Sequence, residues 1–255
     1  MNTLFVGQNA VHLKSIDSTN SYATEMLRQI TPNEGMIVFT FEQTNGRGQR
    51  GNTWQSEPFK NVAFSVILQP SFLHADEQFL LTKITSLAVS DLMAEILKTQ
   101  GIEAETRIKW PNDIYINGRK VAGILIENTL RENTIQHSVI GIGININQTQ
   151  FDGALNAASI KTFTEKDSDL KFVVERLCEF LEARYLQLKT NKRDNIDFMY
   201  LQRLFQLNEW RSYLENDKFF EGKIVSVTSS GKLQMELHNS TIKEFDLKQV
   251  SFAKT

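Results

Sequence analysis

The segment 40–54 reads TFEQTNGRGQRGNTW, and it overlaps the end of an apolar run, residues 37–41, that predicts a strand. Within it, glycines alternate with arginines: Gly46, Arg47, Gly48, Arg50 and Gly51. Glycine tolerates positive φ and leaves its N–H group uncovered, so such a loop can fold its backbone closely around a ligand. Two guanidinium groups held there suit the anionic oxygens of a phosphate or carboxylate. The alternative, which composition alone favours, is a flexible surface loop with two solvated arginines.

The composition indicates a globular chain with one large domain and a small appendage. Its 255 residues are 41% hydrophobic, and the formal net charge of -2 gives no overall basic field for nucleic acid. The single cysteine, Cys178, excludes an intramolecular disulfide framework and a cysteine-rich zinc site, and we expect it to be a buried filler. The sequence has no export signal and no run of about 18 apolar residues, so we expect a cytoplasmic protein without a membrane span.

The sequence on either side of the loop predicts a sheet covered by helices. A weak strand candidate, residues 4–13, precedes the cluster Asp17, Ser18, Thr19 and Asn20, whose side chains suit a helix N-cap and could equally hold a polar ligand group. After the loop, alternation over residues 62–68 predicts a strand. Apolar residues at helical spacing then predict a long amphipathic helix over residues 80–96, which Gly101 closes.

The second informative block, residues 107–127, predicts a β-hairpin. Asn117 and Gly118 separate two β-rich runs, which is the strongest short hairpin signal. Strict alternation along the second strand would put Lys120 on the face of Ala122, Ile124 and Ile126, at the end of a mostly apolar wall. A lysine that extends its ammonium group to solvent from the start of a strand is the alternative.

The third block, residues 138–147, predicts a strand with two faces of different character. Gly141, Gly143 and Asn145 share one face, and isoleucines occupy the other. Two successive positions without side chains would let a flat ligand lie against the backbone, with Asn145 as the next hydrogen-bonding group. Close packing of a helix on the sheet also requires glycine, and the sequence leaves both interpretations open.

The remaining sequence predicts a turn-rich surface segment, two helices and a small β region. The surface segment spans residues 151–167, and helical spacing recurs over residues 170–188 and 196–207. From Trp210, short strands alternate with turns, which predicts a small barrel or meander docked on the main domain.

Together the three blocks resemble the biotin protein ligases. The family's Gly-Arg-Gly-x-Arg-Gly-x-x-Trp loop is similar to residues 46–54, its Lys-Trp-Pro-Asn-Asp segment to residues 109–113, its Arg-Lys-x-x-Gly-Ile-Leu strand to residues 119–125, and its Gly-x-Gly-x-Asn strand to residues 141–145. Four motifs in the family's order are highly specific. The resemblance implies an α+β fold with a mixed or antiparallel central sheet covered by helices, like that of class II synthetases. It also implies a catalytic domain over residues 1–209 and a small SH3-like C-terminal β-barrel over residues 210–255.

The resemblance implies that the protein activates biotin with ATP, with Mg²⁺ present, and transfers biotin to a lysine of a biotin carboxyl carrier protein or domain of a carboxylase. The implied catalytic residues are Lys120, Arg47, Arg50 and Asp113, and Asp113 could meet Mg²⁺ bound to phosphate. The implied biotin-binding positions are Ser18, Thr19, Asn20, Gln43, Gly46, Arg47, Gly48, Gln49, Lys120, Gly123, Gly141 and Gly143. The implied ATP- or adenylate-binding positions are Arg50, Trp54, Lys109, Asn112, Lys120 and Asn145, and the roles of Asn112 and Asp113 are not separated.

Two departures from the family pattern bear on these expectations. Gln49 and Asn52 stand where the family commonly has arginine, so retention of the bound adenylate is expected to be weaker. Residues 1–15 are too few for a helix-turn-helix, so we expect neither DNA binding nor repression. The oligomeric state, including a homodimer, stays open.

Two other functions are compatible with the sequence. A lipoate or octanoate ligase shares the fold class, although the Lys-Trp-Pro-Asn-Asp block and the arginine-containing glycine loop are typical of biotin ligases. A non-catalytic module that binds an adenylate or a partner protein is the other, and it would bind biotin without forming an adenylate.

Overall fold

The computed structural model describes residues 2–151, 156–247 and 249–253, and for Arg50 it describes the backbone alone. Its centre is a seven-stranded sheet with the order β1-β2-β5-β9-β8-β7-β6. The strands are β1 (Ala10–His12), β2 (Met36–Thr40), β5 (Val62–Leu68), β9 (Thr134–Ile144), β8 (Arg119–Arg131), β7 (Asp113–Ile116) and β6 (Thr106–Lys109). Only β1 and β2 pair in parallel within this sheet, so the predicted mixed sheet is confirmed.

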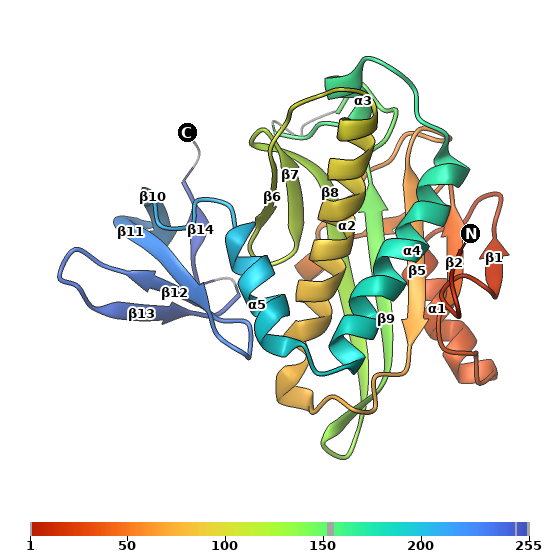
Figure 1. Ribbon diagram of the computed structural model, residues 1–255, viewed down its shortest axis with the longest axis horizontal. Coiled ribbons are helices and arrows are strands. Elements are labelled where there is room, and N and C mark those ends of the chain that lie inside the picture. Colours follow the sequence, from red (N-terminus) through yellow and green to blue (C-terminus); the bar gives the residue numbers. More distant parts are fainter. Residues whose placement is uncertain (1, 152–155, 248, 254–255) are drawn as a thin grey trace.

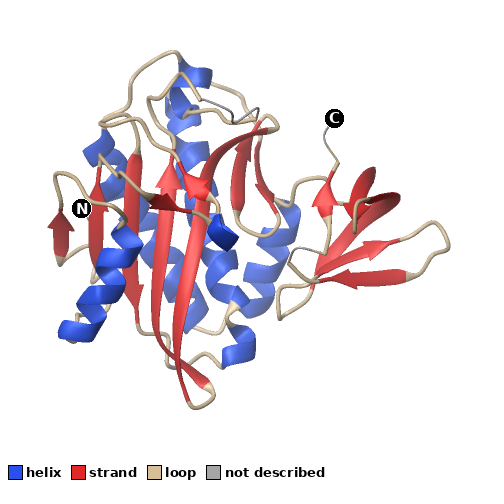
Figure 2. Ribbon diagram, turned by 180° about the vertical axis from the view of Figure 1, so that it is seen from behind, coloured by secondary structure: helices blue, strands red, loops and turns tan. Residues whose placement is uncertain are grey.

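Helices cover both faces of this sheet. α2 (Phe79–Thr99), α4 (Leu170–Lys189) and α5 (Arg193–Gln202) lie on one face, with α2 across β6, β7 and β8 and α4 against β5 (Figure 1). α1 (Thr19–Gln29) lies on the opposite face against β2, β5 and β9 (Figure 2). None of the described helices combines the length and apolar character needed to cross a bilayer.

The main core lies between the sheet and the α2–α4 layer. Isoleucines of β9 point into it, since Ile140, Ile142 and Ile144 are buried while the glycines between them face the α1 side. Burial of apolar side chains on this scale is the main force holding the layers together. Cys178 of α4 is buried in the same core, as predicted, and burial raises the pKa of its thiol to about 12.

Three predicted elements are wrong in extent. Residues 4–9 form turns rather than a strand, because the backbone N–H groups of Leu4, Phe5 and Val6 donate to the buried carboxylate of Glu182. The helix predicted over residues 196–207 ends at Gln202, and Leu204 forms a bridge with Ile108 of β6. The segment predicted to cross the surface contains a short, partly buried helix, α3 (Ile160–Thr164), while residues 152–155 of that segment lie outside the described residues.

The C-terminal region is a five-stranded antiparallel sheet with the order β13-β12-β11-β10-β14. Its strands are β10 (Trp210–Glu215), β11 (Lys218–Val227), β12 (Leu233–Glu236), β13 (Ile242–Phe245) and β14 (Ser251–Phe252). It lies beside the β6 edge of the central sheet (Figure 1). The indole N–H of Trp110 donates to the Gly231 carbonyl at 3.0 Å, and a Cβ on Gly231 would lie 2.4 Å from the Phe79 ring. These contacts confirm that this small β region docks on the main domain.

Candidate active site

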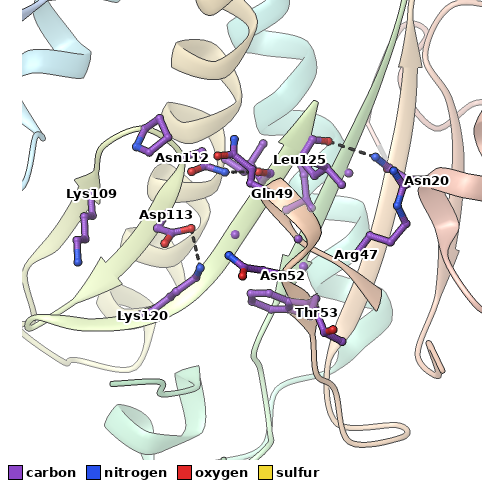
Figure 3. Close-up of a pocket in the computed structure, with 18 of the residues that line it drawn as sticks. Asn20, Arg47, Gln49, Asn52, Thr53, Lys109, Asn112, Asp113, Lys120 and Leu125 are labelled. Atoms are coloured by element: carbon purple, nitrogen blue, oxygen red, sulfur yellow. Dashed lines mark hydrogen bonds and ion pairs between the residues drawn. The ribbon is translucent and has the colours of Figure 1, made fainter. Parts of the chain in front are cut away.

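A cavity of about 390 Å³ opens on the α1 side of the central sheet. Its walls are the start of α1, the segment between β2 and β5, the β7–β8 hairpin, β9, and the end of the C-terminal sheet. Among its lining residues are the predicted positions Ser18, Thr19, Asn20, Gln43, Arg47, Gly48, Gln49, Trp54, Lys109, Asn112, Asp113, Lys120, Gly123, Gly141 and Gly143. Sequence motifs that are far apart in the chain therefore meet in one place (Figure 3).

The floor of the cavity is the predicted strip of glycines. Gly123 of β8 pairs with Gly143 of β9, so two positions without side chains lie next to each other. The indole of Trp54 occupies the space above them, and a Cβ on Gly143 would lie 2.4 Å from Trp54 Cε2. A Cβ on Gly141 would lie 2.3 Å from Asn20 Oδ1. The Trp54 indole and the Asn20 amide thus cover the strip, and the contact of Gly141 with Asn20 of α1 is the close helix packing that the sequence left open beside a flat ligand.

The loop that supplies Trp54 is partly ordered by its own hydrogen bonds. β3 (Gly46–Arg47) pairs with β4 (Thr53–Trp54), and a 3-10 turn, Gln49–Gly51, connects them. Gly46 is not part of the cavity lining. Its α-carbon packs against the Trp54 carbonyl oxygen, and a Cβ added to Gly46 would lie 2.3 Å from that oxygen. The glycine spacing is therefore used for a tight hairpin that carries Arg47 and Trp54 over the sheet.

The prediction for the orientation of Lys120 is wrong. Ile114 pairs with Ala122 and Tyr115 pairs with Lys120, so Val121 is an extra residue in β8 and reverses the alternation. Lys120 consequently shares the face of Gly123, and its Nζ lies 2.7 Å from Asp113 Oδ1. Strict period-two alternation cannot reveal a bulge of this kind. The correction brings the ammonium group into the cavity, where the predicted function needs it.

One end of the cavity is neutral and rich in hydrogen-bonding groups. The Thr19 N–H donates to Gln43 Oε1 at 2.9 Å, and the Ser65 hydroxyl is 2.8 Å from Thr19 Oγ1 and 2.7 Å from Asn20 Oδ1. Ser18 caps α1, since its hydroxyl accepts from the Ser21 N–H, and it also lines the cavity. The capping interpretation is therefore confirmed for Ser18, and the binding of a polar ligand group by this cluster stays a prediction. Ser18, Thr19, Asn20 and Ser65 are buried. Their mutual hydrogen bonds offset the cost of removing these polar groups from water and hold them in fixed orientations.

Arg47 lies at this neutral end rather than beside Lys120. Its guanidinium is 2.7 Å from Glu127 Oε1 and donates to the Ser21 hydroxyl at 3.3 Å. Figure 3 shows Arg47 near Asn20 and Lys120 near Asp113, on opposite sides of the cavity. Two of the three cations expected at the reacting groups, Arg47 and Lys120, thus line one cavity, and each is paired with a carboxylate.

The other end of the cavity carries Lys109 against aromatic rings. Lys109 Nζ lies 4.4 Å from the centre of the Phe252 ring and 5.2 Å from that of Tyr115, which is cation–π geometry. Burial lowers the pKa of Lys109, the nearby Asp113 carboxylate raises it, and the Lys120 charge lowers it further. Phe252 comes from β14, so the C-terminal sheet supplies part of this wall, together with Leu247, Val250 and Ser251.

Three positions predicted to bind ATP or the adenylate do not simply present a free side chain to the cavity. Asn112 lines the cavity, but its amide donates to the Ile124 carbonyl and so holds the β7–β8 hairpin. Asn145 lies just outside the lining, where its Nδ2 donates to the Ala158 carbonyl at 3.1 Å and its buried Oδ1 has no partner among the described residues. The side chain of Arg50 lies outside what the structure describes.

Several residues of the site were not predicted from the sequence. Ser65 is the single hydroxyl in an otherwise apolar strand, and that contrast was a usable signal. Glu127 shares the face of Gly123 by simple alternation, but the Val121 bulge had to be known before that face could be identified as the one that carries Lys120. No local sequence pattern indicated that the C-terminal sheet forms a wall of the cavity, because Phe252 and Lys109, which are in contact, lie more than a hundred residues apart in the sequence.

A comparison with protein families finds one match that covers more than half of the chain. Residues 12–145 match the model of the Biotin/lipoate A/B protein ligase family. The matched region contains α1, the glycine loop, the β7–β8 hairpin and β9, and hence nearly all of the cavity described above.

Curated relatives carry related names. The bifunctional ligase/repressor BirA of Bacillus subtilis is 31% identical over 245 residues, which are 92% of this chain and 72% of that protein. The biotin--[acetyl-CoA-carboxylase] ligase of Mycobacterium tuberculosis is 30% identical over 154 residues, which are 60% of this chain and 55% of that protein.

Solved structures share the fold along nearly the whole chain. A biotin protein ligase from Aquifex aeolicus in complex with biotin and ATP has a TM-score of 0.78 at 26% identity, covering 97% of this chain and 100% of that chain. A biotin protein ligase from Leishmania major in complex with biotinyl-5-AMP, at 23% identity and a TM-score of 0.64, shares the fold over 94% of this chain and 99% of that chain.

Proposed function

The chain belongs to the biotin/lipoate A/B protein ligase family, and from this premise we propose that it joins biotin to ATP and transfers the biotinyl group to a carboxylase. The first step forms biotinyl-5′-AMP and releases pyrophosphate. The second step passes the biotinyl group to a lysine of the biotin carboxyl carrier protein or domain. The observation that carries this proposal is the two-ended cavity, with a neutral hydrogen-bonding end and a cationic end joined by a floor without side chains.

The neutral end favours biotin over lipoate. The ureido ring of biotin is uncharged and has two N–H donors and one carbonyl acceptor, which suit the ordered groups of Thr19, Asn20 and Gln43. The dithiolane ring of lipoate has no comparable donors or acceptors, so it would offer these groups no hydrogen bonds. A site built to hydrogen-bond its substrate rejects such an analogue strongly.

Lys120 is the central group of the first step. A biotin carboxylate must approach the α-phosphate of ATP, and repulsion between these anions dominates the barrier. Lys120 reaches the cavity between its two ends. Once its ion pair with Asp113 opens, its ammonium group can contact both the biotin carboxylate and the α-phosphate. Lys109 adds a second positive charge at the nucleotide end, and we retain Arg50 as a further cation from the sequence.

Trp54 and Asn145 are proposed to hold the adenine. The indole Nε1 of Trp54 and the Oδ1 of Asn145 are buried, and neither has a hydrogen-bond partner among the described residues. A buried donor and a buried acceptor without partners suggest that a ligand completes them, since leaving such groups unpaired is unfavourable. Adenine has a flat face for the indole and a polar edge that both donates and accepts.

Mg²⁺ is proposed to enter bound to ATP. Asp113 is the one acidic side chain among the described residues that line the cavity, and a single carboxylate suits a Mg²⁺ that keeps phosphate and water ligands. The ion would neutralise charge on the phosphates when it is bound. The residues of this chain then position the substrates around Lys120.

The second step requires an uncharged acceptor lysine and a protected adenylate. Asp113 faces the cavity beside Lys120 and is proposed to accept a proton from the incoming ammonium group. The hairpin that carries Arg47 and Trp54 covers the floor, so it would limit hydrolysis of the mixed anhydride by water. Because the reaction consumes ATP, we propose that it occurs in the cytoplasm. The oligomeric state stays open.

A reconstituted reaction tests the proposal. Purified protein, biotin and Mg·ATP should release pyrophosphate only when biotin is present, and a carrier domain added next should become detectable with streptavidin. Excess lipoate should not compete. Labelling with lipoate but not biotin would favour the other branch of the family, and biotin binding without pyrophosphate release would favour a non-catalytic module.

A further inference from the structure

Glu127 joins two residues of the neutral end from outside the cavity. It lies on β8, on the same face as Gly123, and its own side chain is not among those that line the cavity. One carboxylate oxygen, Oε1, is 2.7 Å from the Arg47 guanidinium. The other, Oε2, accepts from Asn20 Nδ2 at 2.9 Å. A single carboxylate thus connects the glycine-loop hairpin to the N-terminus of α1.

The bond to Asn20 fixes the direction of a longer hydrogen-bond chain. Because Asn20 Nδ2 donates to Glu127 and to the Leu125 carbonyl, Asn20 Oδ1 must face the Ser65 hydroxyl, 2.7 Å away. Ser65 in turn is 2.8 Å from Thr19 Oγ1. Thr19 N–H donates to Gln43 Oε1, which leaves the Gln43 amide nitrogen as a donor near the loop. Glu127 is therefore the charged acceptor that, together with the Leu125 carbonyl, orients the Asn20 amide, while the Thr19 N–H orients Gln43.

The bond to Arg47 fixes the position of the hairpin. Arg47 is on β3, and its ion pair with Glu127 holds the hairpin at the neutral end, away from the Lys120 side of the cavity. The pair is partly exposed, with side-chain exposures of 48% for Arg47 and 34% for Glu127, so charge alone contributes little stability to the fold. Its effect is on geometry, since it selects one orientation of a long and mobile side chain.

We propose that Glu127 is a positioning residue for biotin, acting through Asn20 and Arg47 to orient the groups that bind the ureido ring. This inference rests on the proposed function, because it names the substrate group at the neutral end. It also reassigns Arg47 from the reacting anions to the ureido end, and it predicts that loss of Glu127 affects biotin far more than ATP.

The test compares Michaelis constants for biotin and ATP in biotin-dependent pyrophosphate release. Glu127→Ala should raise KM for biotin about tenfold, as expected when a buried polar group loses its partner, with kcat and KM for ATP changed less than about twofold. Glu127→Gln keeps an acceptor for Asn20 but loses the charge facing Arg47, so its KM for biotin should fall between those of the wild type and Glu127→Ala. Thermal melting of each variant separates these effects from a loss of folded protein.

A double-mutant cycle tests whether Glu127 acts through Arg47. Glu127→Ala in an Arg47→Ala background should raise KM for biotin by a smaller factor than Glu127→Ala alone. Glu25→Ala is the matched control, because it breaks an ion pair of 3.0 Å with Arg28 on α1, and it should change neither KM. An unchanged KM for biotin in Glu127→Ala, or an equal rise in both KM values, overturns the inference.

Calorimetric titration with biotin alone separates this inference from the proposed function. If the wild type binds biotin but releases no pyrophosphate, the ligase activity fails, and a tenfold weaker binding by Glu127→Ala would still support the positioning role. Equal biotin affinity of the wild type and Glu127→Ala contradicts it, as would a wild-type protein that does not bind biotin.

Discussion

Lys120 Nζ lies 2.7 Å from Asp113 Oδ1, across the pairing of β7 with β8 and directly beside the paired glycines of the cavity floor. The bulge at Val121 creates this contact, because it turns Lys120 toward the face that carries Asp113. A bound anion can reach Lys120 only by replacing or joining Asp113. The pair therefore links the cation of the first step to the carboxylate proposed for the second.

Asp113→Asn should impair transfer more than adenylate formation. The amide cannot accept a proton from the acceptor lysine, whose ordinary pKa is about 10.4, so transfer near neutral pH should fall by about 100-fold while pyrophosphate release falls much less. Raising the pH should narrow the difference, because the acceptor then loses its proton unaided. Single-turnover transfer from preformed biotinyl-5′-AMP across a pH series measures this. Equal losses in both steps at every pH would remove Asp113 from proton transfer.

Gly143→Ala should destabilise the protein through Trp54. The added Cβ would lie 2.4 Å from Trp54 Cε2, which forces the indole to move, and overpacking of this kind commonly costs about 1–3 kcal/mol. The backbone itself is an extended strand that accepts alanine. Urea unfolding should show the loss in the wild-type background and little loss in a Trp54→Ala background. A loss of the same size in both backgrounds would place its origin elsewhere.

Lys109→Arg should extend activity to higher pH. Burial lowers the pKa of Lys109 below its ordinary 10.5, so the positive charge at the nucleotide end is lost at a lower pH than that of an ordinary lysine, as pH rises through the lowered pKa. Anion binding that depends on this charge should decline over the same range. Arginine keeps its charge at such pH values, so the alkaline limb of log kcat/KM for ATP should move upward. An unchanged limb would show that another group titrates there.

Gln49→Arg should slow the release of the bound adenylate. Gln49 lines the cavity at the turn of the hairpin, where the resemblance to the biotin protein ligases implies an arginine. One charge-assisted hydrogen bond to the adenylate phosphate is worth about 1.5 kcal/mol, or about tenfold in the dissociation rate. Dissociation of labelled biotinyl-5′-AMP by rapid filtration measures the rate. Gln49→Glu should accelerate it, and equal rates for both variants would contradict a role for charge at this position.

The elements that could be predicted are those with a local signal. Isoleucine and glycine alternate over β9, and Asn117 and Gly118 mark the hairpin, where both adopt positive φ. The glycine loop, the N-cap cluster and the β7–β8 hairpin also meet in one cavity, as the resemblance implied. These features depend on neighbours within a few residues, which a single sequence displays directly.

What could not be predicted depends on contacts between distant segments. The Val121 bulge arises from the register of β7 against β8, and no residue type marks it. Lys83 is on the buried side of α2, with 2% of its side chain exposed, because Asp197 of α5 pairs with it at 2.8 Å. The partnership of Arg47 with Glu127 likewise joins residues eighty positions apart. Helical or strand periodicity contains no information about such pairs.

The most direct test of the central claim, that Lys120 lets the two anionic substrates meet, is biotin-dependent pyrophosphate release by Lys120→Ala. Removing a charge that stabilises a transition state in a confined site typically lowers kcat by at least about 100-fold, and we predict a loss of that size with the melting temperature little changed. Lys218→Ala, at an exposed position at the start of β11 in the C-terminal sheet, is the control and should keep wild-type activity. If Lys120→Ala releases pyrophosphate at a rate within about twofold of the wild-type rate, instead of the predicted loss of about 100-fold, the account is contradicted.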